Sequence, residues 1–158
     1  MEEKPPVSTA LEKLNIPHSV FRHPGQVMSL EQAAQERGHR PEQVVRSILF
    51  NLGKGEYVMA LVAGPPQISW KKLRQQMGKS RIRMATEDEV FTNTGYRIGT
   101  VSPFGLSRPI KILIDPSVMK ESEVSIGSGI RNTAIILKSA DLLQGLQDAE
   151  VIPLVEPP

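Results

Sequence analysis

Residues 93–105 are the stretch whose residue types best fit a chemical site. They read NTGYRIGTVSPFG, with three glycines and one proline among apolar residues. Glycine permits a positive φ and a close backbone approach to a ligand, and proline fixes φ. The segment from Gly99 to Pro103 therefore predicts backbone N–H groups turned toward a pocket, which suits a carbonyl, a phosphate or an oxyanion. The alternative is a tight connection between two strands, because glycine and proline mark turns more often than sites.

Arg46 is a second candidate, because it lies in the middle of the strand-forming run VVRSILF at 44–50. A period of two places Arg46 beside Val44 and Ile48, on the more apolar face of the predicted strand. A charge there is costly unless it is paired or lines a cavity. Two interpretations stay open: an ion pair with a carboxylate at a sheet edge, or a cation that points into a substrate pocket.

Residues 71–83 form a basic segment without an acidic residue. Such a segment can neutralise phosphates of a nucleic acid. The alternative is the solvated face of a surface helix and strand, since the net charge of the whole chain is only +2. An aromatic content of 4% argues against a platform that stacks single-stranded bases. The basic residues of the segment are Lys71, Lys72, Arg74, Lys79, Arg81 and Arg83.

The sequence lacks the residues that several other kinds of catalytic or metal site require. The chain has no cysteine, which excludes disulfides, thiolate metal sites and cysteine nucleophiles. Its three histidines form no spaced metal-binding pair, and neither a phosphate-binding P-loop nor a serine nucleophile elbow occurs. No apolar run approaches the length of a membrane span, and the N-terminus lacks a signal-peptide core. We therefore expect a cytoplasmic protein with no metal and no organic cofactor.

The surrounding elements predict one mixed α/β domain over residues 1–158, of class α+β. Capping patterns predict helices over about 9–15, where Thr9 and Glu12 would form a capping box, and after Ser29, Ser69, Thr86 and Ser139. Runs of β-forming residues predict strands at 18–22, 44–50, 57–63, 81–84, 110–115, 123–126, 133–137 and 151–152. Strands and short helices mix without strict alternation, which favours a mixed curved sheet with helices packed around it.

The order of these parts resembles the YbaK/EbsC family, which is similar to the prolyl-tRNA synthetase editing domain. The resemblance runs from about Ser8 to Gln147. Its most specific part is the block T-G-Y…G-x-x-S-P-x-G from Thr94 to Gly105, supported by the strand 44–50 and the turn Gly127-Ser128-Gly129. It implies a curved mixed sheet or partial barrel, surrounded by short helices.

The resemblance also implies an activity: hydrolysis of the ester of a mischarged tRNA, in trans, with a tRNA and an aminoacyl-tRNA synthetase as partners. It implies catalytic roles for Arg46, Gly99 and Ser102. The residues of the loop and the turn that it assigns to substrate binding are Thr94, Gly95, Tyr96, Thr100, Val101, Pro103, Gly127, Ser128 and Gly129. The basic residues expected to contact tRNA are Lys71, Lys72, Arg74 and Lys79.

Two positions depart from the family pattern. Arg46 stands where the family carries a functional lysine, and a guanidinium cannot lose its proton to act as a base. An arginine in place of the lysine would still supply positive charge, so an electrostatic role for this position remains. Ala134 stands where some relatives carry an aspartate. The rival hypothesis is therefore a catalytically impaired module that binds tRNA or an aminoacyl-like ligand, and a mixed α/β domain unrelated to RNA is a third.

Overall fold

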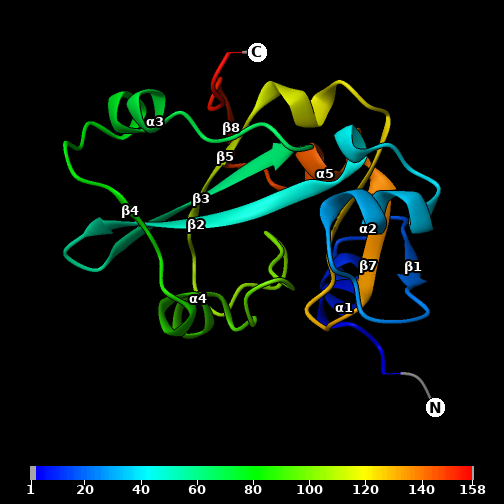
Figure 1. The fold of residues 1–158 in the computed structure, drawn as a ribbon. Coiled ribbons are helices and arrows are strands. Elements are labelled where there is room, and N and C mark those ends of the chain that lie inside the picture. The colour runs from blue at the N-terminus through cyan, green and yellow to red at the C-terminus, as the bar shows by residue number, and fades with distance from the viewer. Residues whose placement is uncertain (1–2, 158) are drawn as a thin grey trace.

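Two β-sheets form the framework of the computed structural model, which describes residues 3–157 (Figure 1). One sheet has five strands in the order β4-β2-β3-β5-β8, and the other has three in the order β1-β7-β6. A bridge between Val44 and Ser125 joins them, and neither sheet closes into a barrel. The predicted α+β class is confirmed, with the strands divided between two sheets.

The five-stranded sheet is built on a long antiparallel hairpin of β2 and β3, with β5 and β8 added in parallel beyond β3. Its strands are β2 (Val45–Gly53), β3 (Glu56–Ala63), β4 (Arg83–Met84), β5 (Lys111–Ile114) and β8 (Glu150–Val151). The second sheet is antiparallel throughout. Its strands are β1 (Ser19–Arg22), β6 (Glu123–Gly127) and β7 (Thr133–Lys138).

Short helices connect and cover these strands. They are α1 (Pro6–Lys13), α2 (Leu30–Arg37), α3 (Trp70–Met77), α4 (Glu87–Thr94) and α5 (Ser139–Gly145), with 3₁₀ turns at Pro41–Gln43 and Pro116–Met119. The side chains of Ser29, Ser69 and Thr86 cap α2, α3 and α4 as predicted. No helix within residues 3–157 is long and apolar enough to cross a membrane.

Two predicted helix starts were wrong. Helix α1 begins at Pro6, so Thr9 lies inside the helix and caps nothing. A proline at the first helical position has its φ already set for the helix, and this outweighed the Thr9 signal. Helix α5 has Lys138 at its N-cap, while Ser139 Oγ donates to Glu121 O at 2.6 Å.

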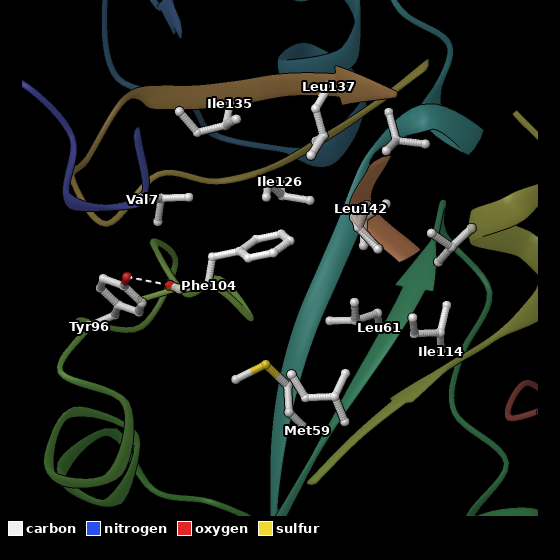
Figure 2. Close-up of a cluster of buried hydrophobic side chains, with 14 of the residues drawn as sticks. Val7, Met59, Leu61, Tyr96, Phe104, Ile114, Ile126, Ile135, Leu137 and Leu142 are labelled. Carbon is white, nitrogen blue, oxygen red and sulfur yellow. Dashed lines mark hydrogen bonds between the residues drawn. The ribbon is translucent and has the colours of Figure 1, made fainter. Parts of the chain in front are cut away.

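Successive side chains of a strand point to opposite faces of the sheet, so the five-stranded sheet has a hydrophobic cluster on each face. Val45 and Leu49 of β2 belong to the larger cluster, whereas Phe50 belongs to the smaller one with Leu73 of α3. The larger cluster also receives side chains from the three-stranded sheet, α1 and α5 (Figure 2). The open end of the space between the two sheets is where a cavity forms.

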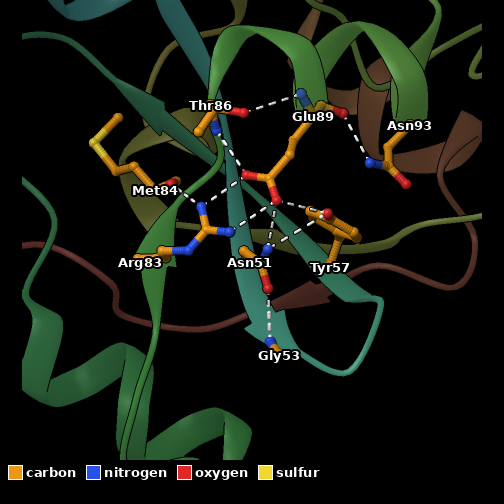
Figure 3. A network of polar contacts seen from close by, with 8 residues as sticks. All are labelled: Asn51, Gly53, Tyr57, Arg83, Met84, Thr86, Glu89 and Asn93. Atoms are coloured by element: carbon orange, nitrogen blue, oxygen red, sulfur yellow. Dashed lines mark hydrogen bonds and ion pairs between the residues drawn. The ribbon is translucent and has the colours of Figure 1, made fainter.

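Glu89 fixes the start of α4 against the hairpin (Figure 3). Its carboxylate accepts hydrogen bonds from both terminal nitrogens of Arg83, at 2.7 and 2.8 Å, and from Asn51 and Tyr57. It also accepts from the backbone N–H of Thr86, which completes the predicted capping box. These bonds lower the pKa of Glu89 well below its usual range, the bond from Arg83 most of all. The network thereby positions β4 and α4, which contribute to the cavity wall.

Candidate functional site

A cavity of about 500 Å³ lies at the end of β2, between the two sheets. Its walls come from Val44 and the first residues of β2, the loop at 98–101, the segment 27–37 that includes α2, residues of β4 and α4, and the ends of β6 and β7. Most of the lining side chains are apolar, with a few polar groups among them. This composition is typical of small-molecule sites, where a few polar groups fix the orientation of the ligand.

The loop at 98–101 is held against the turn at 127–129. Gly99 has a φ of +87°, and the N–H of Thr100 donates to Arg97 O at 3.0 Å, which closes a tight turn. Gly129 N donates to Thr100 O at 2.9 Å. A Cβ at Gly127 would overlap with the carbonyl oxygen of Val101. The two segments that the sequence singled out are therefore in direct backbone contact.

Three of the four backbone N–H groups of this loop are free. Within residues 3–157, the N–H groups of Ile98, Gly99 and Val101 donate no hydrogen bond, and all three residues line the cavity. Most backbone N–H groups are paired in folded proteins, so these donors are available to a ligand, and those of Gly99 and Val101 flank the turn that Thr100 N closes. A carbonyl oxygen or an oxyanion is the natural acceptor for them.

Arg46 lines the cavity but is anchored at its edge. Its Nε donates to Gly64 O at 2.9 Å and its Nη2 donates to Pro66 O. No carboxylate within residues 3–157 pairs with it, so the expected ion pair at a sheet edge is absent. Burial lowers the pKa of the guanidinium, which still remains protonated at neutral pH. Arg46 therefore supplies a fixed positive charge.

Ser47 lines the cavity and has a buried hydroxyl group. Its Oγ has no hydrogen-bond partner within the described residues, although it is shielded from solvent. Such a group is costly unless a ligand or water satisfies it. Sequence reasoning missed Ser47 as a site residue, but a signal was there: on β2 it shares a face with Val45 and Leu49, where a polar side chain is out of place.

Arg37 is the other cavity residue that sequence reasoning missed. It follows Ala33 and Ala34, both buried, by one helical turn, so it lies on the apolar face of α2. Its Nη1 donates to Ser125 Oγ at 2.8 Å. Burial lowers its pKa to about 10, which leaves it charged at neutral pH. A basic residue at a position that periodicity assigns to the core was the available signal.

No titratable base faces the cavity. Among the described residues that line it, the ionisable side chains are Arg37 and Arg46, and there is no aspartate, glutamate, histidine, lysine or tyrosine. Both arginines are permanent cations at neutral pH. The arrangement can therefore bind and stabilise negative charge, but its own side chains do not supply a general base.

Thr94 and Tyr96, predicted to bind substrate, and Ser102, predicted to be catalytic, make hydrogen bonds within the loop and do not line the cavity. Thr94 Oγ1 donates to Val90 O at 2.6 Å, and Tyr96 OH donates to Phe104 O at 2.5 Å (Figure 2). Burial raises the pKa of Tyr96 to about 12. Ser102 is fully buried, and its Oγ accepts from Phe104 N at 3.1 Å.

The remaining predicted residues divide between the cavity and its surroundings. Val101 and Gly127 line the cavity, as Gly99 and Arg46 do, while Thr100 lines a neighbouring one. Pro103 lines a third cavity near Lys111 and Leu146. The residues that line none of these three cavities are Thr94, Gly95, Tyr96, Ser102, Ser128 and Gly129.

Some basic residues of the segment 71–83 already contact other groups of the protein, whereas others make no ion pair. Lys72 Nζ donates to Val155 O at 2.9 Å, and Lys79 pairs with Glu56 at 3.7 Å. Lys71 and Arg74 are exposed on α3 and make no ion pair within residues 3–157. Helix α3 follows the turn that Arg46 holds, so these two charges lie on the element next to the cavity edge.

The chain belongs to the aminoacyl-tRNA editing domain family, because the model of that family matches residues 24–144. This confirms the predicted YbaK-like resemblance. The uncharacterized protein YwhH of Bacillus subtilis (strain 168) is 36% identical over 115 residues, which cover 72% of each chain. The proline--tRNA ligase of Kosmotoga olearia is 36% identical over 92 residues, or 58% of this chain and only 16% of the ligase.

A solved structure agrees with this assignment. The crystal structure of a protein proposed as a trans-editing enzyme for prolyl tRNA synthetase superposes with a TM-score of 0.88 at 29% identity, and the match covers 96% of each chain. The two proteins therefore share one fold over nearly their whole matched length.

Proposed function

We propose that this protein is a trans-editing aminoacyl-tRNA deacylase, which hydrolyses the ester between an amino acid and the 3′-terminal adenosine of a mischarged tRNA. The observation that carries the proposal is the pair of free N–H groups at Gly99 and Val101 in a largely apolar cavity. Membership of the editing family supports the substrate class. The ligase matches and the similar crystal structure favour tRNA(Pro) as the carrier.

The free N–H groups suit the charge that develops during ester hydrolysis. Water adds to the ester carbonyl, and the carbonyl oxygen becomes an oxyanion that Gly99 N and Val101 N can stabilise by donating hydrogen bonds. Collapse of this intermediate breaks the bond to the ribose oxygen, which takes a proton, and releases the free amino acid. Removing one oxyanion donor typically slows such a reaction by about a hundredfold or more.

The proton of the attacking water must go to the substrate or to solvent, because no titratable base lines the cavity among the described residues. The amino group of the aminoacyl ester is a suitable acceptor, or the neighbouring ribose hydroxyl passes the proton on to the ribose oxygen that leaves. Ser47 Oγ, which lacks a partner within residues 3–157, would orient the water or the amino group. Arg46 would contribute a fixed positive charge at the cavity edge. We assign catalysis to positioning and electrostatics rather than to a protein base.

The surroundings of the cavity suit the rest of a tRNA acceptor end. Met28, Met84 and Ile98 line the cavity and are 75%, 55% and 44% exposed, so they form an apolar rim on which a terminal base can pack. Lys71 and Arg74 on α3 would contact backbone phosphates. The activity belongs in the cytoplasm, where tRNA is charged by synthetases, and it would act without a metal or an organic cofactor.

A non-catalytic binding module is the second candidate. The lack of a base among the described cavity residues favours it, together with Arg46, whose guanidinium is already engaged by two carbonyl groups. In this alternative the cavity binds the aminoacyl end without hydrolysis.

Incubating the protein with a panel of mischarged tRNAs separates the two candidates. Release of free amino acid is measured for alanyl- and cysteinyl-tRNA(Pro), with the correctly charged prolyl-tRNA(Pro) as a reference. The same substrates are given to Ser47→Ala and to the matched control Ser19→Ala, whose serine is exposed on β1. We expect turnover of at least one mischarged tRNA, a lower rate for Ser47→Ala and an unchanged rate for Ser19→Ala. Binding of the panel without any release would favour the module and contradict the enzyme.

A further inference from the structure

Arg37 is a half-buried cation whose charge has no ion-pair partner within residues 3–157. Its Nε donates to His23 Nε2 at 3.0 Å and its Nη1 donates to Ser125 Oγ at 2.8 Å, both neutral acceptors. No carboxylate in this described range forms an ion pair with it. Glu36 offsets part of this charge without contacting it. A buried cation that no carboxylate contacts directly is costly, so such a site is suited to an anionic ligand.

His23 and Glu36 hold this guanidinium in place. A guanidinium only donates hydrogen bonds, so His23 Nε2 must accept from Arg37 and the ring proton lies on Nδ1. His23 Nδ1 then donates to Glu36 Oε1, at 2.6 Å. The imidazole is fully buried, and Gln32 donates to the other carboxylate oxygen at 2.9 Å. The arginine is thus fixed before any ligand arrives, and its Nη2 is left without a partner in the described part of the chain.

Arg37 lies between two cavities. It lines the main cavity and also a neighbouring one of about 390 Å³, and Gly99 lines both as well. The second cavity receives Arg131 and Asn132 from the β6–β7 turn, and no acidic residue is among the described residues that line it. An anion-binding space therefore adjoins the space assigned to the ester.

We propose that Arg37 binds the phosphodiester that links the last two nucleotides of the tRNA acceptor end. This inference rests on the proposed function for the identity of the ligand. The terminal adenosine carries the aminoacyl ester on its ribose hydroxyl and a phosphate on its 5′ side. With the ester beside Gly99 in the main cavity, that phosphate enters the second cavity, where the fixed fork of Arg37 donates to its oxygens. Arg131 adds positive charge from the rim.

A pair of matched ligands tests directly whether Arg37 recognises the negative charge of the phosphodiester. The dinucleotide cytidylyl-adenosine contains the phosphodiester, and its methylphosphonate analogue has the same bases without the charge. Binding of both is measured by calorimetry for wild type, Arg37→Gln, Arg37→Lys and the control Lys13→Gln, whose lysine is exposed on α1 outside both cavities. Thermal unfolding of each variant checks that it is folded.

We expect wild type and Lys13→Gln to prefer the charged dinucleotide by about tenfold or more, the size of one charge-assisted hydrogen bond. Arg37→Gln should lose this preference, and Arg37→Lys should retain part of it. Equal binding of the two ligands by wild type, no binding of either at millimolar concentration, or an unchanged preference in Arg37→Gln would overturn the inference. So would inorganic phosphate binding as tightly as the dinucleotide, because the site would then take free phosphate.

The result does not depend on turnover, since neither dinucleotide carries the aminoacyl ester that a deacylase hydrolyses. Failure of the deacylase proposal would appear as an inert protein in the panel of mischarged tRNAs. Failure of the Arg37 proposal would appear only in the comparison of the two dinucleotides.

Discussion

Gly127 lies directly against the backbone of Val101. A Cβ at Gly127 would overlap with the Val101 carbonyl oxygen and come within 2.8 Å of Thr100 O. Because both neighbours are backbone atoms, a side chain at 127 cannot be accommodated by a rotamer change. This close approach sets the distance between the β6–β7 turn and the loop that carries the free N–H groups.

Replacing Gly127 with alanine should therefore displace the loop. We expect Gly127→Ala to lower the free energy of unfolding by roughly 1–3 kcal/mol, the usual cost of overpacking, and to reduce deacylation more than stability alone would explain. Gly25→Ala is the matched control, because a Cβ there meets no atom within 4 Å. Denaturant unfolding and single-turnover hydrolysis measure the two effects. If Gly127→Ala were as stable as wild type, the loop could move away from the new Cβ at no cost, which would contradict the prediction.

Glu89 should make the stability of the protein depend on acidic pH. Its pKa is lowered in the folded state from an ordinary value of 4.5, so its contribution is present above that pH and is lost as the pH falls below it. Glu89→Gln should be less stable than wild type at neutral pH, and the difference should shrink as the pH falls. Unfolding curves at several pH values test this.

Glu87→Gln is the control for this series, because Glu87 lies in the same helical turn and is exposed. It should follow the wild-type pH dependence closely. A stability difference for Glu89→Gln that stays constant from neutral to acidic pH would show that the bonds in Figure 3 do not lower its pKa.

The basic residues of α3 and the segment after it should contribute unequally to tRNA binding. Lys71 and Arg74 have no ion-pair partner within residues 3–157, whereas Lys72 and Lys79 are already engaged. We expect Lys71→Glu with Arg74→Glu to weaken binding. The slope of log affinity against log salt should fall by about 0.7–0.9 for each phosphate that the variant no longer neutralises.

Lys13→Glu on α1 changes the charge in the same direction and serves as the control for this pair. It should leave the salt dependence of tRNA binding close to that of wild type. An unchanged slope in the double variant would exclude α3 from the interface.

Local sequence signals predicted the elements well where the residues themselves impose the geometry. Ser29, Ser69 and Thr86 cap their helices through their side-chain oxygens, as predicted. Thr9 shows the limit of such signals, since two adjacent prolines started the helix earlier. Pattern alone could not choose between these competing helix starts.

The composition of the cavity was harder to predict, because it depends on which strands meet. The loop around Gly99 and the turn at Gly127 were both recognised as candidates, but their backbone contact comes from the packing of two distant segments. Tyr96 and Ser102 belong to the same motif, yet their hydroxyl groups form bonds within the loop. Arg37 enters the cavity from α2, a helix that no motif connected to the site.

Amino acid release by Arg46 variants tests the central claim most directly. The best substrate of the tRNA panel is incubated with wild type, Arg46→Ala, Arg46→Lys and the control Lys13→Ala, after thermal unfolding has shown each to be folded. We predict that wild type and Lys13→Ala exceed the uncatalysed rate, and that Arg46→Ala falls by about a hundredfold, as expected when a preorganised charge is removed. Wild type at the uncatalysed rate, with activity gained only in Arg46→Lys, would contradict the claim that this cavity is a working deacylase.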